Sequence, residues 1–255
     1  MIREILSNLN EGEISLEEAV KEIEGLRIDM VGEIARLDTG RPVRCGIPEV
    51  ILAEGKAPAH LAEIAKKQVE SRGRCIISRL HPEHAGAVRA LCDLKGIRSS
   101  LHEAANMLVL ARDEDGEPQK TGGVVGIVTA GTSDIGVAEE ARVIAEEMGC
   151  TVLTAYDVGA AGIHRLFPAI RDLLDAHVFV VAAGREGTLP AVVAGLVDRP
   201  VIGVPVSSGY GYMGQGRAAL ASMLQSCSVI GVVNIDAGFT AGAFAARIAN
   251  MVVRA

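Results

Sequence analysis

The chain has 255 residues, of which 49% are hydrophobic, and it carries a formal net charge of −7 at pH 7. This length and composition allow a substantial core, in one large domain or two modest ones. The acidic balance excludes a protein that works by coating a nucleic acid backbone, although a few arginines and helix N-termini can still bind a small anion. Five cysteines without CxxC spacing predict a reducing, cytoplasmic setting rather than a disulfide framework or a zinc site.

The amino-terminal segment, residues 1–38, is predicted to be helical. Residues 1–6 mix charge into an amphipathic pattern and lack the apolar core of a signal peptide, and no run of the chain is long enough to span a membrane. Apolar residues recur at helical spacing over residues 2–9, and Ser15 followed by Glu18 predicts a capping box for a second helix. Two short helices of this kind need a larger body, or another subunit, to cover their apolar faces.

Residues 39–119 alternate short β-type runs with helical patterns. We predict strands at residues 49–53, 75–78 and 107–111 and helices at residues 58–71 and 82–95, which together make a small α/β domain. Residues 112–120 are charged, contain Gly and Pro and lack apolar anchors, so a boundary with a third region, residues 120–255, is expected there.

The second half alternates apolar, β-branched runs with helical patterns. These runs occupy residues 123–129, 152–156, 177–183, 201–204 and 229–235. Five strands that alternate with helices predict right-handed crossovers and an open parallel sheet with helices on both faces. Ligands of such sheets bind beyond the carboxyl ends of the strands, and most of the glycine, hydroxyl and charge of this half follows those ends.

Residues 123–134, with the sequence GVVGIVTAGTSD, are the most informative of these segments. A buried strand breaks into glycine and small hydroxylic residues where a helix over residues 135–148 is expected to begin, which lets backbone N–H groups approach a phosphate. Ser133 or Asp134 is expected to cap that helix. Many α/β proteins use such a turn only to pack helix on strand, so the turn alone leaves ligand binding open.

Four short elements follow one another at the strand ends of residues 122–254. They are, in order, Gly131-Thr132-Ser133-Asp134, Ala161-Gly162-Ile163-His164-Arg165, Leu189-Pro190 and Pro200-Val201-Ile202-Gly203-Val204-Pro205-Val206. These elements resemble those of the PurE family, the carboxylases and mutases of aminoimidazole ribonucleotide metabolism. The resemblance implies a PurE-like, flavodoxin-like parallel-sheet domain. The chain departs from that family at Thr188, because PurE chemistry depends on a histidine just before Leu-Pro.

Further segments distinguish this chain from the PurE family. They are residues 44–56 (RCGIPEVILAEGK), residues 184–190 (GREGTLP), Cys227 and residues 234–239 (NIDAGF). With these segments the chain resembles the LarB family better, over essentially its whole length. LarB proteins are pyridinium-3,5-biscarboxylic acid mononucleotide synthases, which begin assembly of the nickel-pincer nucleotide cofactor. The resemblance implies nicotinic acid adenine dinucleotide and CO₂ or bicarbonate as substrates, and the dicarboxylated mononucleotide and AMP as products.

The same resemblance implies a homo-oligomer, an octamer in the family, that acts on a small dinucleotide and needs no tightly bound organic cofactor. Neither a nucleic acid nor a membrane is expected as a partner. A requirement for Mg²⁺ to neutralise the diphosphate stays open, because no carboxylate cluster of the sequence has recognisable metal-ligand spacing.

Cys227 and Glu186 are the expected catalytic residues. A pyridinium ring is electron-poor, so its carbon meta to nitrogen cannot attack CO₂ directly. If a thiolate first adds para to the nitrogen, that meta carbon becomes the nucleophilic end of an enamine. Cysteine suits this step because its anion is a good nucleophile and also leaves readily. Glu186, on a strand end in a glycine-rich loop, is the expected base that removes the ring proton after carboxylation.

The expected substrate-binding residues are hydroxylic, charged and amide side chains near the strand ends, together with two cations from the first half. They are Thr132, Ser133, Asp134, His164, Arg165, Arg185, Asn234, Asp236, Arg44 and Lys56. The structural alternatives are helix caps for Ser133, Asp134 and Glu186, a solvated pair for His164 and Arg165, a surface patch for Arg41, Arg44 and Lys56, and a core position for Cys227.

Two other classes of function stay open from the residues alone. The first is a PurE-like carboxylase or mutase that acts on an imidazole ribonucleotide, against which the residue at position 188 counts. The second is a non-catalytic nucleotide-binding module, which would bind its ligand without turnover.

Overall fold

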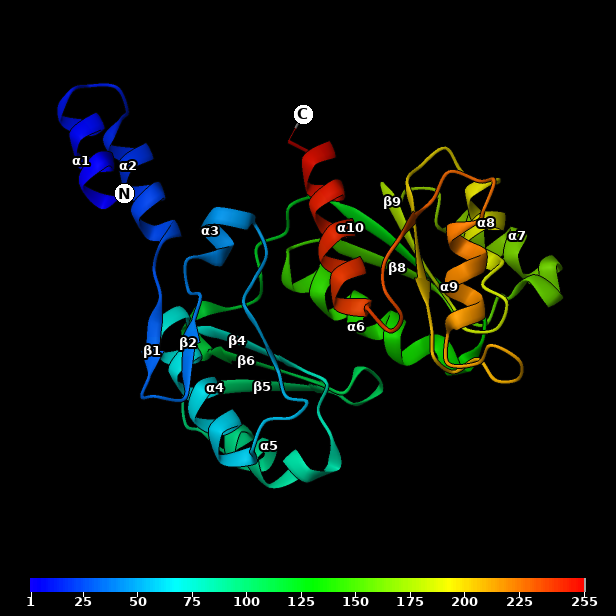
Figure 1. Cartoon of the computed structure of the whole chain (residues 1–255), viewed down its shortest axis with the longest axis horizontal. Helices are drawn as coiled ribbons and strands as arrows, with labels where there is room; N and C mark the ends of the chain where they lie inside the picture. Colours follow the sequence, from blue (N-terminus) through cyan, green and yellow to red (C-terminus); the bar gives the residue numbers. More distant parts are fainter. Residues whose placement is uncertain (255) are drawn as a thin grey trace. The chain divides into compact units, whose positions relative to one another are not determined.

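The computed structural model describes residues 1–254. The chain forms two compact units: the first comprises Met1–His102 and Asn106–Gly116, and the second comprises Glu103–Ala105 and Glu117–Ala255. In Figure 1 the first unit runs from blue into green and the second from green to red. The short segment Glu103–Ala105, a single 3₁₀ turn (η2), packs against a helix of the second unit and therefore belongs to it.

Two short helices and a hairpin open the first unit. They are α1 (Ile2–Asn10), α2 (Leu16–Gly25), the antiparallel strands β1 (Asp29–Val31) and β2 (Ala35–Leu37), and α3 (Arg41–Cys45). The predicted capping box is confirmed, because the Ser15 N–H donates to a Glu18 carboxylate oxygen over 2.8 Å and the Glu18 N–H donates to Ser15 Oγ over 3.2 Å. The hairpin is a feature that sequence periodicity does not predict, since each strand has only three residues.

The rest of the first unit is a four-stranded mixed sheet with two helices. Its elements are β3 (Val50–Leu52), α4 (Pro58–Arg72), β4 (Arg74–Ser78), η1 (Pro82–His84), α5 (Ala85–Cys92), β5 (Ile97–His102), β6 (Met107–Arg112) and η3 (Asp113–Asp115), with the strand order β3-β4-β6-β5. The three predicted strands and the first predicted helix are present. The helix expected over residues 82–95 is shorter: a 3₁₀ turn precedes it and it ends at Cys92, which leaves room for the additional edge strand β5.

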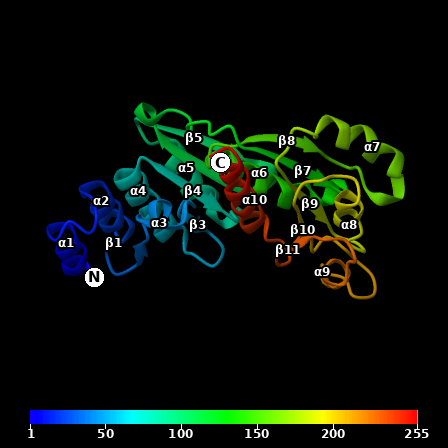
Figure 2. The ribbon, with the colours of Figure 1, turned by 90° about the horizontal axis from the view of Figure 1, so that it is seen from above.

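The second unit is built on a five-stranded parallel sheet (Figure 2). Its strands are β7 (Val124–Thr129), β8 (Thr151–Ala155), β9 (Val178–Ala183), β10 (Val201–Pro205) and β11 (Gly231–Val232), in the order β11-β10-β9-β7-β8. Every neighbouring pair is parallel. The central strands β9 and β10 are buried along their whole length, which explains their continuous apolar sequence. The predicted sheet is confirmed.

Helices cover both faces of this sheet. They are α6 (Ile135–Glu147), α7 (Ile163–Asp172), α8 (Leu189–Ala194), α9 (Arg217–Leu224) and α10 (Gly238–Val252). One apolar cluster joins the sheet to α6 and α10, and a second joins the opposite face to α7, α8 and α9. The α6 and α10 helices lie side by side (Figure 1) and approach closely at Gly242, where a Cβ atom would lie 2.7 Å from Ala141 Cα. The predicted α/β class, with a parallel sheet covered by helices on both faces and a smaller sheet-containing region before it, is therefore confirmed.

None of the helices found in residues 1–254 is both long and apolar enough to cross a lipid bilayer.

Candidate active site

The strand order of the second unit contains one reversal. The chain passes from β7 to β8 on one side of β7, and then crosses to β9 on its other side. Connections that leave β7 and β9 therefore run in opposite directions, which opens a crevice beyond their carboxyl ends. A cavity of about 470 Å³ lies there, lined by residues from four strand ends: Ala130, Gly131, Ser133, Asp134, Gly159, Ala160, Ala161, Ala183, Arg185, Glu186, Gly187, Thr188, Leu189, Ser208 and Tyr210.

Asp134 is the buried side chain of this cavity and connects two of the strand ends that form it. Its side chain is only 3% exposed, and it accepts hydrogen bonds from the Gly131 N–H over 2.9 Å and from Ser208 Oγ over 2.8 Å. Burial raises the pKa of the Asp134 carboxyl above its ordinary value, and the nearby Asp236 carboxylate acts in the same direction, against the hydrogen bonds from Ser208, Gly131 and Gly184. The cap predicted for α6 is corrected by this geometry, because Asp134 closes the preceding 3₁₀ turn, η4 (Thr132–Asp134), and no side chain caps α6.

Two glycines shape the loop that follows β9. A Cβ atom at Gly184 would lie 2.9 Å from Asp134 Oδ1 and would overlap Ser208 Oγ, so only glycine lets the β9 end pass the buried carboxylate. Gly187 has a φ of +67°, and a Cβ atom there would lie 2.7 Å from Ala219 Cα on α9. Together these glycines let the loop fold tightly against its neighbours and present the side chains of Arg185 and Glu186 at the cavity.

Arg185, Glu186 and Ser133 are exposed and line the rim of the cavity. Helix α8 begins at Leu189 without a side-chain cap, so the alternative interpretation of Glu186 as a helix cap is wrong. The rim therefore offers one carboxylate, one guanidinium and a hydroxyl. This combination can hold an anionic or zwitterionic ligand and present a base to it.

Five other predicted binding residues are not among the lining residues. Thr132 and His164 are exposed, and Arg165 pairs over 2.7 Å with Asp157 at the end of β8. The Asn234 side chain accepts the N–H of the next residue over 2.8 Å, and Asp236 accepts the Ser207 N–H over the same distance. Asp236 thus holds the loop after β10 beside the cavity. For the other four residues, substrate binding stays a prediction, because none of them lines the cavity.

Cys227 also lies away from these lining residues. It is exposed in the loop between α9 and β11, where the neighbouring Ser228 hydroxyl donates to the Ala191 carbonyl oxygen over 3.0 Å. Because Gly231 pairs with Ile202 in parallel register, the loop that holds Cys227 leads into the amino-terminal edge of the sheet. Glu186 follows the carboxyl end of β9. One copy of the chain therefore does not bring the two predicted catalytic residues together.

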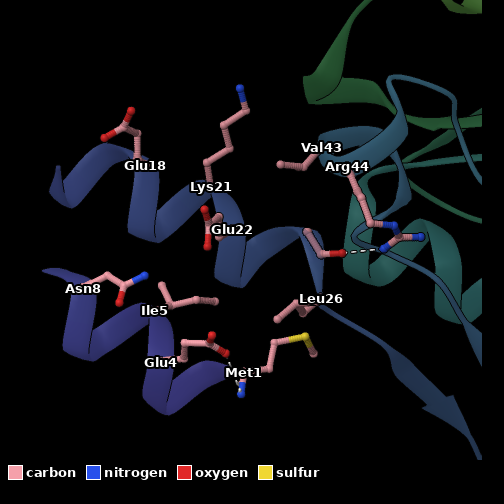
Figure 3. A pocket seen from close by; sticks show the side chains of 11 residues that line it. Met1, Glu4, Ile5, Asn8, Glu18, Lys21, Glu22, Leu26, Val43 and Arg44 are labelled. Atoms are coloured by element: carbon pink, nitrogen blue, oxygen red, sulfur yellow. Dashed lines mark hydrogen bonds and ion pairs between the residues drawn. The ribbon is translucent and has the colours of Figure 1, made fainter. Parts of the chain in front are cut away.

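The two predicted binding residues of the first unit are engaged within that unit. The Arg44 guanidinium pairs with Asp38 and donates to the Gly25 carbonyl oxygen, and the hydrogen bond to Asp38 raises the pKa of Arg44. Arg44 lies at one end of a cavity of about 620 Å³ bounded by α1, α2 and α3 (Figure 3). Lys56 Nζ donates to the Leu52 carbonyl oxygen over 2.7 Å.

Sequence reasoning did not assign Ser208 and Tyr210 to the site. Both follow β10 in a glycine-rich loop, Ser208 as the donor to Asp134 and Tyr210 as a lining residue. The signal that could have found Ser208 is its position shortly after a predicted strand, because the carboxyl ends of parallel strands meet at one edge of the sheet.

Metal ligation receives no support from the side chains of residues 1–254, in which no group of three or more His, Cys, Asp and Glu residues is arranged to hold an ion.

Comparison with known proteins places both halves of the chain. Residues 124–254 match the family model described as AIR carboxylase, and residues 28–112 match the model described as LarB/PurE-like N-terminal domain. An uncharacterized protein of Methanocaldococcus jannaschii is 42% identical over 254 residues, covering 98% of this chain and 97% of its own.

Two mutases are similar to about half of the chain. The N5-carboxyaminoimidazole ribonucleotide mutase of Methanocaldococcus jannaschii is 35% identical over 127 residues, which cover 48% of this chain and 76% of that enzyme. The mutase of the same description from Pyrococcus horikoshii is 32% identical over 133 residues, which cover 49% of this chain and 71% of that enzyme. With a PurE-like domain of the carboxylase and mutase type preceded by the characteristic amino-terminal domain, the chain belongs to the LarB family.

Proposed function

We propose that this protein carboxylates the pyridinium ring of nicotinic acid adenine dinucleotide and hydrolyses its phosphoanhydride. The products are pyridinium-3,5-biscarboxylic acid mononucleotide and AMP. The observation that carries the proposal is the cavity at the reversal of the parallel sheet. Its lining includes the Glu186 carboxylate and the Arg185 guanidinium, and it has Thr188 where PurE chemistry would need a histidine beside Leu189.

The proposed chemistry balances through a transient thioether. The Cys227 thiolate forms a bond to the ring carbon para to nitrogen, and the electron pair displaced toward the nitrogen cancels its positive charge. The enamine carbon meta to nitrogen then attacks CO₂ and forms the new C–C bond. Glu186 takes the proton from that carbon, the C–S bond breaks, and the thiolate leaves as the ring regains aromaticity. Water cleaves the phosphoanhydride in a separate step.

The position of Cys227 makes a second copy of the chain part of this proposal. In one copy the thiol is not on the cavity, and exposed apolar side chains flank it: Leu224 is 67% exposed and Val229 is 95% exposed. Apolar residues this exposed on both sides of a candidate nucleophile favour a surface that another copy covers. We propose that the Cys227 loop of one copy completes the cavity of another in a homo-oligomer.

The decisive experiment incubates the full-length protein with nicotinic acid adenine dinucleotide and ¹³C-bicarbonate. We expect mass spectrometry to show a mononucleotide with one labelled carboxyl group, together with an equal amount of AMP. A parallel reaction offers an imidazole ribonucleotide in place of the dinucleotide, because relatives that share the second half of the chain are described as mutases of such a ribonucleotide. Turnover of the imidazole substrate alone would overturn the proposal, and binding of the dinucleotide without any product would indicate a non-catalytic module.

Two variants separate the roles of the proposed catalytic residues. Glu186→Gln keeps the size of the side chain but removes its basicity, so we expect it to form the thiol adduct with the ring and to lose turnover by about a hundredfold or more. Cys227→Ser is expected to lose the adduct as well as turnover, because an ordinary hydroxyl rarely ionises. Trapping the adduct in both variants would refute the assignment of Cys227.

A further inference from the structure

A stacked cation and aromatic ring stand at the rim of the cavity. The Arg185 Cζ atom lies 4.4 Å from the centroid of the Tyr210 ring, and the Arg185 guanidinium also donates to the Tyr210 hydroxyl over 2.6 Å. Both residues line the cavity, and Tyr210 is 73% exposed. An exposed aromatic ring that already attracts a cation on one face can bind a flat cationic ring on its other face.

Hydrogen bonds fix the conformation of the loop that carries Tyr210. It is fixed on one side by the Ser208–Asp134 hydrogen bond, and its tip is closed by bonds from Gly214 N–H to the Gly211 carbonyl oxygen and from Gln215 N–H to the Gly209 carbonyl oxygen, over 3.0 and 2.9 Å. The loop therefore holds the Tyr210 backbone two residues from a buried anchor.

We propose that Tyr210 is the stacking residue for the pyridinium ring of the substrate, which takes the aromatic face opposite Arg185. Stacking there adds a second cation–π contact to Tyr210 and leaves the first in place, so the new contact contributes to binding. The Arg185 guanidinium can pair with a substrate carboxylate or phosphate, which it can bind through two parallel N–H donors. This inference rests on the proposed function, because it assigns the ring subsite of that substrate.

The proposal makes a kinetic prediction. Thiolate addition removes the positive charge of the ring, so Tyr210 attracts the bound substrate more strongly than the neutral adduct. A contact of this kind contributes to binding without lowering the barrier of the chemical step. Loss of the aromatic face is therefore expected to raise KM and to leave kcat undiminished.

The absence of tryptophan from the chain permits a direct test. Tyr210→Trp introduces a single fluorescent indole on the cavity rim, and Tyr212→Trp places the same reporter on the same loop at a side chain that is 96% exposed and does not line the cavity. We expect nicotinic acid adenine dinucleotide to quench the first variant saturably, while AMP, which lacks the pyridinium ring, leaves it bright. Saturable quenching of Tyr212→Trp, or equal quenching of Tyr210→Trp by AMP, would overturn the assignment.

Calorimetry provides a second test, in which the affinities of Tyr210 variants for the dinucleotide and for AMP are measured. Tyr210→Leu is expected to weaken dinucleotide binding by about twofold to thirtyfold, the range that the strength of cation–π contacts gives, whereas Tyr210→Phe keeps the aromatic face and most of the affinity. Neither change should alter the affinity for AMP. If the wild-type protein makes the carboxylated product but Tyr210→Leu binds the dinucleotide normally, the stacking role alone fails. If Tyr210→Trp is quenched saturably but no carboxylated product forms, the stacking role stands and the proposed function fails.

Discussion

The close approach of Gly184 to the buried carboxylate of Asp134 permits a quantitative prediction. A methyl group in Gly184→Ala would lie 2.9 Å from Asp134 Oδ1 and would overlap Ser208 Oγ, so the Ser208 hydroxyl must rotate away and its 2.8 Å bond to Asp134 must break. A hydrogen bond to a charged group contributes about 1.5 to 3 kcal/mol. Gly184→Ala and Ser208→Ala are therefore each expected to lower the free energy of unfolding by about 2 kcal/mol.

The double variant tests the mechanism. Since both changes remove the same hydrogen bond, Gly184→Ala with Ser208→Ala should cost about 2 to 3 kcal/mol rather than the sum of about 4 kcal/mol. Urea denaturation of the full chain, followed by circular dichroism, measures each value. Gly231→Ala is the control, because a Cβ atom there would meet only an ordinary contact, 3.9 Å from the Val201 carbonyl oxygen. Additive losses for the two changes would refute the reasoning.

Three further predictions concern packing, pH and assembly. Gly242→Ala should lower the free energy of unfolding by about 1 to 3 kcal/mol, because the clash of the new methyl group with the α6 backbone exceeds the gain in helix propensity. Gly86 is exposed and uncrowded, so Gly86→Ala should stabilise the protein slightly. Thermal melts measure both changes, and a Gly242→Ala variant more stable than the wild type would contradict the packing argument. Folding raises the pKa of Asp134, so the folded state holds the proton of this carboxyl more tightly than the unfolded state does. The stability of the wild type, measured relative to Asp134→Asn, should therefore fall as the pH rises from about 4 through the raised pKa. A difference in denaturation midpoints that does not change with pH would contradict this prediction. Co-assembled Cys227→Ser and Glu186→Gln copies should regain about a quarter of wild-type turnover if each site combines two copies, and no recovery would place both residues in one chain.

Much of the second unit could be predicted from the sequence because its strands are buried on both faces. Such strands read as continuous runs of β-branched residues, as β9 and β10 do. In the first unit, β5 escaped prediction because its sequence, IRSSLH, is mostly polar and the strand lies at a sheet edge. Periodicity over three residues, as in the β1–β2 hairpin, carries too little signal to be recognised.

The part of the site that could be predicted lies directly after predicted strands. Ser133, Asp134, Arg185 and Glu186 follow β7 and β9, the two strands at the reversal, and all four line the cavity. Tyr210 could not be assigned in the same way, because the curl of the loop after β10 depends on hydrogen bonds between residues that the sequence does not pair. Motif resemblance singled out Cys227 but contains no information about which copy of the chain its thiol serves.

The buried carboxylate at the bottom of the cavity has a consequence for how this fold can diversify. Asp134 joins the ends of β7 and β10 through bonds that span 74 residues of sequence, so the pocket acquires its form only when the parallel strands are already paired. Most of the other polar side chains that line the cavity, by contrast, are exposed on the surrounding loops. Substitutions at the rim can therefore change what the cavity binds while the buried anchor preserves the architecture, which is a physical route by which one fold comes to serve different functions.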